Sequence, residues 1–220
     1  MTALAHFQTS IDGADRLLAM YAELRRHRQL GARGRLDAAN SDLLWLPRAS
    51  VVASMSALDA YIHAVLYERI PTVLRADEVP QPLCDAMASI IPIKSGGTFR
   101  EAIGILRSED SLGELSRALA ERTLSFLSYQ APEKVSAGYE LIGYPNVFVR
   151  VSELWPGPRT TADDLRRNLA NYAKRRNQIA HEGDREATGE PRQMRPVYAE
   201  GCREFVGNLV ARLNRIVFGI

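Results

Sequence analysis

The segment from Leu169 to Asp184 holds the side chains of this sequence that are best suited to chemistry. It reads LANYAKRRNQIAHEGD, and its candidate residues are Lys174, Arg175, Arg176, Asn177 and His181. Histidine titrates near neutral pH and can accept or donate a proton, whereas arginine stays charged and binds phosphate through a planar fork of N–H groups. Together they suit RNA cleavage, because RNA supplies its own nucleophile, the 2′-OH, and needs proton transfer and stabilisation of a crowded phosphorane.

These properties predict a role for each residue. We assign His181 as the general base or acid, Arg176 as the phosphate clamp and Asn177 as an orienting donor. Lys174 and Arg175 are predicted to bind the flanking RNA backbone. The alternative without a catalytic role is that His181 is a surface histidine that caps the last turn of a helix.

The helical spacing of these residues predicts a dimer. On a helix, Arg176 and His181 are about 140° apart, so we expect that one chain cannot bring both to one phosphate. Asn177 and His181 are four residues apart and should stack on one face. A two-fold axis beside this helix would set the partner's Arg176 opposite His181. The sequence therefore predicts a homodimer that completes the site.

The other elements follow from apolar periodicity and from turn residues. The longest pattern predicts a helix from Leu43 to Ile70 that ends before Pro71, with Pro47 near its start or at a kink. Thr160 or Thr161 should cap the site helix, which should end near Gly183. Further helices are predicted at about residues 7–21, 83–90, 99–106, 112–129, 132–141 and 196–216. Residues 147–151 have strand propensity, although a helix leading into a loop is favoured there.

Composition predicts one all-α domain spanning residues 1–220. A chain of 220 residues with 46% hydrophobic and 25% charged residues is of ordinary globular type. Nothing in the patterning requires a sheet, so we expect a helical bundle of four to five core helices plus short accessory helices. Without ~18 uninterrupted apolar residues or a signal-like N-terminus, the protein is expected to be cytoplasmic and to have no membrane partner.

The share of arginine among the basic residues is more informative than the net charge. The net charge is only +2, but three of the 28 basic residues are lysines, which leaves 25 arginines. Arginine suits phosphate, although a GC-rich genome would explain the same bias. With four histidines and 25 arginines in 220 residues, chance alone gives about 0.45 Arg–His pairs at the Arg176–His181 spacing, so the spacing is weak evidence.

No cofactor or metal site is predicted. Cys84 and Cys202 form neither a CxxC pair nor a Cys/His cluster, and no group of carboxylates suited to magnesium is visible.

Three segments resemble the HEPN superfamily. RRNQIAHEGD resembles its motif of Arg, a polar residue, several further residues and His, and looks like that of the RiboL-PSP-HEPN group or of a close stand-alone relative. SMSALDAYIHAVL resembles the central helix of that group, and SYQAPEKVSAGYELIGYPNVF resembles its Phe/Tyr-Gln-x-Pro segment. The resemblance spans about residues 50 to 185. The sequence departs from the pattern at Asp59, where relatives often carry Glu.

The resemblance implies an HEPN-type helical bundle that dimerises and cuts RNA to leave a cyclic phosphate end. It also implies a toxin–antitoxin or anti-phage setting, with RNA, a second copy of the chain and a cognate antitoxin as partners. The alternative is a catalytically inactive HEPN module that binds RNA or a partner protein.

Two other residue sets have a chemical and a structural interpretation. Asp59 and His63, one turn apart, could form a second catalytic pair, but a histidine satisfied by a carboxylate within the bundle is favoured. Tyr172 could stack a base, but its helical spacing with Leu165 and Leu169 favours a place in the core.

Overall fold

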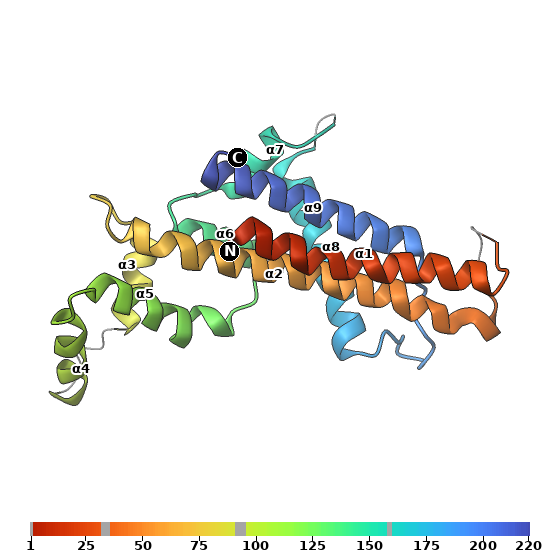
Figure 1. Cartoon of the computed structure of the whole chain (residues 1–220), viewed down its shortest axis with the longest axis horizontal. Coiled ribbons are helices and arrows are strands. Elements are labelled where there is room, and N and C mark those ends of the chain that lie inside the picture. The colour runs from red at the N-terminus through yellow and green to blue at the C-terminus, as the bar shows by residue number, and fades with distance from the viewer. Residues whose placement is uncertain (1, 32–35, 91–95, 158–159) are drawn as a thin grey trace.

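The protein folds as an elongated bundle of helices (Figure 1). The computed structural model describes residues 2–31, 36–90, 96–157 and 160–220. Over these residues it contains α-helices and two short 3-10 helices and no strand, which confirms the predicted all-α class.

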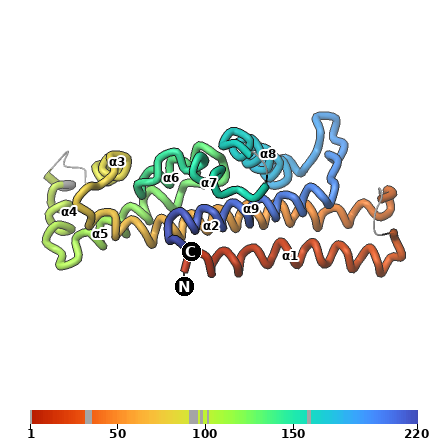
Figure 2. The backbone as a smooth tube through the Cα atoms, turned by 90° about the horizontal axis from the view of Figure 1, so that it is seen from above, coloured from red at the N-terminus to blue at the C-terminus, as the bar shows by residue number. Residues whose placement is uncertain are grey.

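Two long helices form the spine of the molecule. α1 (Ala3–His27) and α2 (Trp45–Val73) run antiparallel and pack along their length, joined through the 3-10 helix η1 (Ala38–Leu44). α9 (Pro196–Phe218) runs beside α2, and α8 (Ala162–His181) lies on the side of α2 away from α1 (Figure 2).

α2 is central because it is apolar around much of its circumference. Val51, Met55 and Leu58 are fully buried, and so are Ile62 and Leu66. Among the described residues, Ala38–Val73 is the one helical stretch that by length and composition could span a membrane, and 56% of its apolar window is buried inside the protein. This burial is what the central helix of a bundle requires.

The shorter helices lie along one side of this spine and at one end of it. α3 (Gln81–Ile90), α4 (Gly96–Leu106), α5 (Ser111–Arg122) and η2 (Leu124–Phe126) gather at the end opposite to the α1–α2 connection. α6 (Pro132–Leu141) and α7 (Val147–Glu153) lead from them to α8.

Two predicted helix boundaries are wrong. α2 continues through Pro71 to Val73, because a proline in the last turn interrupts few helical hydrogen bonds, and Arg75 donates to the Pro71 carbonyl at 2.9 Å. α5 ends at Arg122, well before Tyr129, and η2 replaces its expected last turns.

Residues 147–151 belong to α7, so the helical interpretation is confirmed over the strand. Val147, Phe148 and Val151 are buried at helical spacing against the α8 and α9 side of the bundle. Asn146 precedes them with φ 56, a left-handed conformation that turns the chain into the helix.

Candidate active site at the end of α8

α8 begins at a capping box. The Thr161 hydroxyl accepts the backbone N–H of Asp164 at 3.1 Å, while the Asp164 carboxylate accepts the backbone N–H of Thr161 at 3.1 Å. The Thr161 hydroxyl also donates to the Asp164 carboxylate at 2.7 Å, and this bond, together with that from the Thr161 backbone N–H, lowers the pKa of Asp164 below its usual value. Leu165, Leu169 and Ala173 are the buried residues of the helix. The predicted start at Thr161 is therefore confirmed, and the polar side of α8 faces solvent.

The chain turns sharply at the C-terminal end of α8, directly after the motif from Arg176 to His181. The helix ends at His181, and Gly183 and Asp184 both adopt positive φ, 62° and 54°. The backbone N–H of Asp184 then donates to the Gln178 carbonyl at 3.0 Å. Such left-handed residues close helices by satisfying their last carbonyls, and they confirm the predicted end near Gly183.

Asp184 is a buried anchor for this helix end. Its side chain is 1% exposed and binds the Arg48 guanidinium of α2 and the Arg175 guanidinium of α8, the latter with 2.7 Å between Nη1 and Oδ1. Arg48 also donates to the carbonyl of Arg192 at 2.7 Å, and Arg175 to that of Gln193 at 3.0 Å. These contacts fasten the end of α8 to α2 and to the segment that leads into α9.

The location of Arg175 corrects its predicted role. Only 14% of its side chain is exposed, and its guanidinium is engaged by Asp184 and the Gln193 carbonyl, so it does not fit the predicted contact with RNA. The sequence gave no sign of this pairing, because Asp184 lies nine residues from Arg175 and Arg48 lies in another helix, so no periodic pattern links the three residues. Lys174, in contrast, is exposed.

The three motif residues meet within one chain. Arg176 Nη1 lies 3.4 Å from His181 Nε2 and donates to Asn177 Oδ1 at 3.0 Å. The expectation that one chain could not bring Arg176 and His181 together is therefore wrong. That expectation assumed that each side chain points straight out from the helix axis. The arginine side chain is long enough to reach around the last turn of α8, where no further helical turn blocks it.

The contact between Arg176 and His181 specifies what the imidazole can do. A guanidinium only donates, so this contact is a hydrogen bond in the neutral tautomer that carries the ring proton on Nδ1 and the lone pair on Nε2. His181 and Asn177 are exposed, whereas Arg176 is partly buried and its Nε is buried without a partner among the described residues. The arrangement places a proton acceptor and a phosphate-binding cation side by side at an accessible helix end.

The outward face of α8 is polar along its length. Its exposed residues at helical spacing are Asp163, Arg167, Asn171, Lys174, Asn177 and His181. The large exposed hydrophobic side chains of the described segments lie on other elements. This face therefore suits an anionic ligand better than an apolar one.

His63 has the structural role that the sequence favoured. Its Nε2 lies 3.1 Å from the Leu127 carbonyl and 3.9 Å from Asp59, whose carboxylate accepts the backbone N–H of Tyr129. The imidazole also packs edge-on against the Tyr129 ring, with 5.0 Å between centroids. The Nε2 atom is bonded within the bundle, by a carbonyl more closely than by the predicted carboxylate, while the buried Nδ1 atom has no hydrogen-bond partner among the described residues.

Tyr172 lies in an aromatic cluster. Its ring is 5.2 Å from that of Tyr198 and 5.4 Å from that of Phe205, which confirms its predicted packing against the core.

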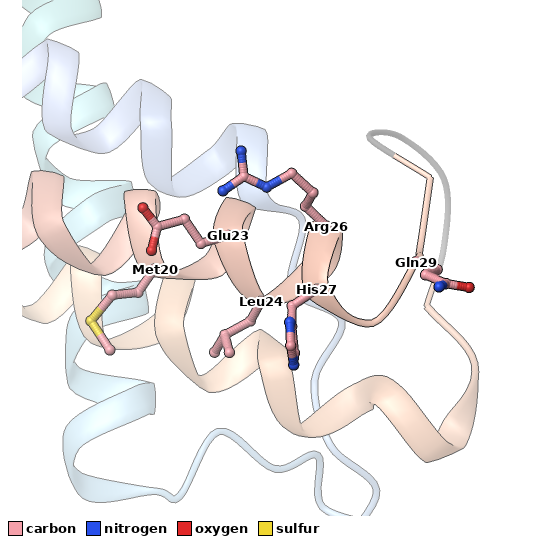
Figure 3. Close-up of a pocket in the computed structure, with 6 residues that line it drawn as sticks. All are labelled: Met20, Glu23, Leu24, Arg26, His27 and Gln29. Atoms are coloured by element: carbon pink, nitrogen blue, oxygen red, sulfur yellow. The ribbon is translucent and has the colours of Figure 1, made fainter.

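A surface hollow elsewhere does not form a comparable site. It lies at the end of α1 and is lined by Met20, Glu23, Leu24, Arg26, His27 and Gln29. These side chains point in different directions and do not converge on a common point (Figure 3). Across the part of the chain that the structure describes, no group of three or more His, Cys, Asp or Glu residues is placed to hold a metal ion.

Comparison with known proteins found no match among family models, curated proteins or solved structures. The resemblance to HEPN proteins therefore stays a prediction, and the geometry at the end of α8 is what bears on function.

Proposed function

We propose that this protein is a metal-independent endoribonuclease of HEPN type, with Arg176, Asn177 and His181 as its active site. The observation that carries the proposal is the 3.4 Å approach of the Arg176 guanidinium to His181 Nε2 at an exposed helix end. One phosphodiester placed there can contact both groups at once.

Each residue has a distinct part in this mechanism. His181, with its lone pair on Nε2, takes the proton of the 2′-OH as general base. The 2′ oxygen attacks phosphorus, the 5′ oxygen of the next nucleotide leaves, and a 2′,3′-cyclic phosphate remains. Arg176 exchanges its contact with His181 for the phosphate oxygens and stabilises the phosphorane through two N–H groups.

The supporting residues act through position and charge. Asn177, which the sequence predicted as an orienting donor, instead accepts a hydrogen bond from Arg176 through Oδ1 and so orients the guanidinium. Asp184, with Arg48 and Arg175, holds the helix end rigid, which matters because catalysis depends on groups held near their reactive positions. Lys174 binds the neighbouring RNA backbone from the outward face of α8.

A homodimer is part of the proposal, with a changed purpose. Because Arg176 and His181 meet within one chain, a second copy is not needed to pair them. It would instead supply a second imidazole, which can donate a proton to the leaving 5′ oxygen.

The single imidazole beside Arg176 also favours a second candidate, a catalytically inactive module that binds RNA. General acid–base cleavage needs a donor as well as an acceptor, and among the described residues the hydrogen bonds place one imidazole, that of His181, in contact with Arg176. If no second copy completes the site, the same surface would bind RNA without cutting it. A toxin or anti-phage role with a cognate antitoxin follows only from the resemblance.

One cleavage assay separates the two functions. Purified protein is incubated with total RNA in EDTA, and the new ends are tested for 2′,3′-cyclic phosphate. We expect cutting that persists in EDTA and that falls by about 10²–10⁴-fold in His181→Ala, the usual contribution of general acid–base catalysis.

The matched control is Arg117→Ala, which removes an exposed arginine from α5, away from this face, 61% exposed and paired with Glu114 at 3.1 Å. This variant should keep nearly full activity. Equal cutting by wild type and His181→Ala would reject the site, and binding without cutting by the wild-type chain would support the inactive module.

A further inference from the structure

Trp45 is one of the exposed aromatic residues of the described chain. It is the first residue of α2 and is 52% exposed. Its ring covers the guanidinium of Arg48, with 5.1 Å between the ring centroid and Cζ. A half-exposed indole offers an aromatic face on which a planar ligand can stack.

The indole is held in a defined place rather than free to move. Arg48 beneath it is 4% exposed and is fixed by Asp184 and by the Arg192 carbonyl. The guanidinium attracts the ring through a cation–π interaction. One face of the indole is therefore occupied by a rigid cation, while its exposed area remains accessible to a ligand.

Trp45 is connected to the candidate site through Arg48 and Asp184. Asp184 binds Arg48, follows His181 by three residues and is hydrogen-bonded to the last turn of α8 through Gln178. Trp45 and the end of α8 are thus fixed to the same buried pair of charges. A strand bound at Arg176 and His181 that continues over this pair would reach the indole.

We propose that Trp45 is a stacking platform for an unpaired base of the RNA bound at Arg176 and His181, and that the substrate is therefore single-stranded. This inference rests on the proposed function. A base stacked on the indole would form a layered arrangement of base, ring and guanidinium, in which the cation also favours the anionic strand. A base within a duplex is already stacked on both faces and cannot bind the ring in this way.

Tryptophan fluorescence tests the proposal directly. The probe is a short single-stranded RNA, 2′-O-methylated throughout so that binding is measured without cleavage, compared with the same strand in a blunt duplex. We expect the single strand to quench the protein fluorescence and the duplex to leave it nearly unchanged. The quenching should disappear in Trp45→Phe, which retains Trp155 as an internal reference.

Affinity measurements separate stacking from charge. Trp45→Leu should weaken binding of the single strand by about tenfold, whereas Trp45→Phe should retain most of the affinity because it keeps an aromatic face. The matched control is Tyr67→Leu, a 43% exposed aromatic residue that lies 22 residues further along α2, about 33 Å along the helix axis. This control should bind as the wild type does.

The outcomes distinguish the two proposals. Unchanged affinity in Trp45→Leu, with the variant folded by circular dichroism, overturns the stacking proposal even where cleavage is observed. Equal quenching by duplex and single strand overturns it too. Quenching by the single strand without any cleavage of unmodified RNA upholds the platform and rejects the nuclease, which leaves the inactive binding module.

Discussion

The histidines His181 and His63 share a residue type but differ in exposure and in the partners of their side chains. Each sits on a helix of the core and near a charged side chain four or five residues away. His181 is exposed at the end of α8, and its Nε2 faces the Arg176 guanidinium. His63 lies in the middle of α2, 18% exposed, with its Nε2 on a backbone carbonyl and its ring against Tyr129.

The difference shows that burial and side-chain reach, more than residue type, decide whether a histidine is accessible to a ligand. A phosphate can approach His181 from solvent and find a cation beside it, whereas the Nε2 of His63 is already occupied. The carboxylates of Asp59 and Asp184 also differ in burial and in the groups that they bind. Asp59 is 24% exposed and accepts one backbone N–H, while Asp184 is buried and holds two guanidiniums.

Exchanging the two histidines for alanine should give opposite phenotypes, and this is the largest effect we expect. His181→Ala should lose cleavage by about 10²–10⁴-fold and keep its stability within about 0.5 kcal/mol, as for other surface changes. His63→Ala should keep cleavage and lose about 1–2 kcal/mol of unfolding free energy, because it leaves the Leu127 carbonyl unpaired. Both variants are measured by urea denaturation and by RNA cleavage. Similar stability and similar activity in the two would contradict the contrast between the two histidines.

Neutralising the two carboxylates should separate the regions by stability. Asp184→Asn leaves two guanidiniums without their counter-charge, and we expect a loss of about 3 kcal/mol, near the lower limit for broken buried ion pairs because Arg175 keeps some solvent contact. Asp59→Asn should cost less than about 1 kcal/mol, since the amide oxygen can still accept the Tyr129 N–H. Comparable losses for the two variants in urea denaturation would show that Asp184 is not the anchor.

Replacing Arg176 by lysine tests the shape of the cation rather than its charge. Lysine keeps the positive charge and loses the planar fork that binds two phosphate oxygens, so Arg176→Lys should lower the rate constant for cleavage by about tenfold and Arg176→Ala by about a hundredfold. Single-turnover cleavage kinetics would measure both. A lysine variant as slow as the alanine variant would sharpen the assignment to bidentate binding, and one as fast as wild type would reject it.

The smallest effect concerns the start of α8. Hydrogen bonds from Thr161 lower the pKa of Asp164 below its usual value of 3.8, so its ionised form stabilises the folded chain above that pH. This contribution should be lost as the pH falls through the lowered pKa. Asp164→Asn should therefore reduce the melting temperature slightly at neutral pH, and the difference from wild type should shrink in acid. A difference that does not change with pH would show that charge has no part in the cap.

Sequence patterning was sufficient for the helices whose signals are local. The threonine and acidic residues before α8, the glycine after it and the apolar period of α2 each act over a few residues, so they can be identified without tertiary contacts. The end of α5 and the passage of α2 through Pro71 were missed, because neighbouring elements decide how far a marginal helical turn continues.

The sequence by itself determined the all-α class, the segment that carries the candidate chemistry and the boundaries of the helix that presents it. Only the tertiary structure decided which cations of that segment remain available. Arg175 is bound by a buried aspartate together with an arginine 127 residues earlier in the chain, Arg48, while Arg176 bends round the helix end to His181. Such pairings depend on burial and on side-chain reach across distant elements, which spacing along the chain does not encode.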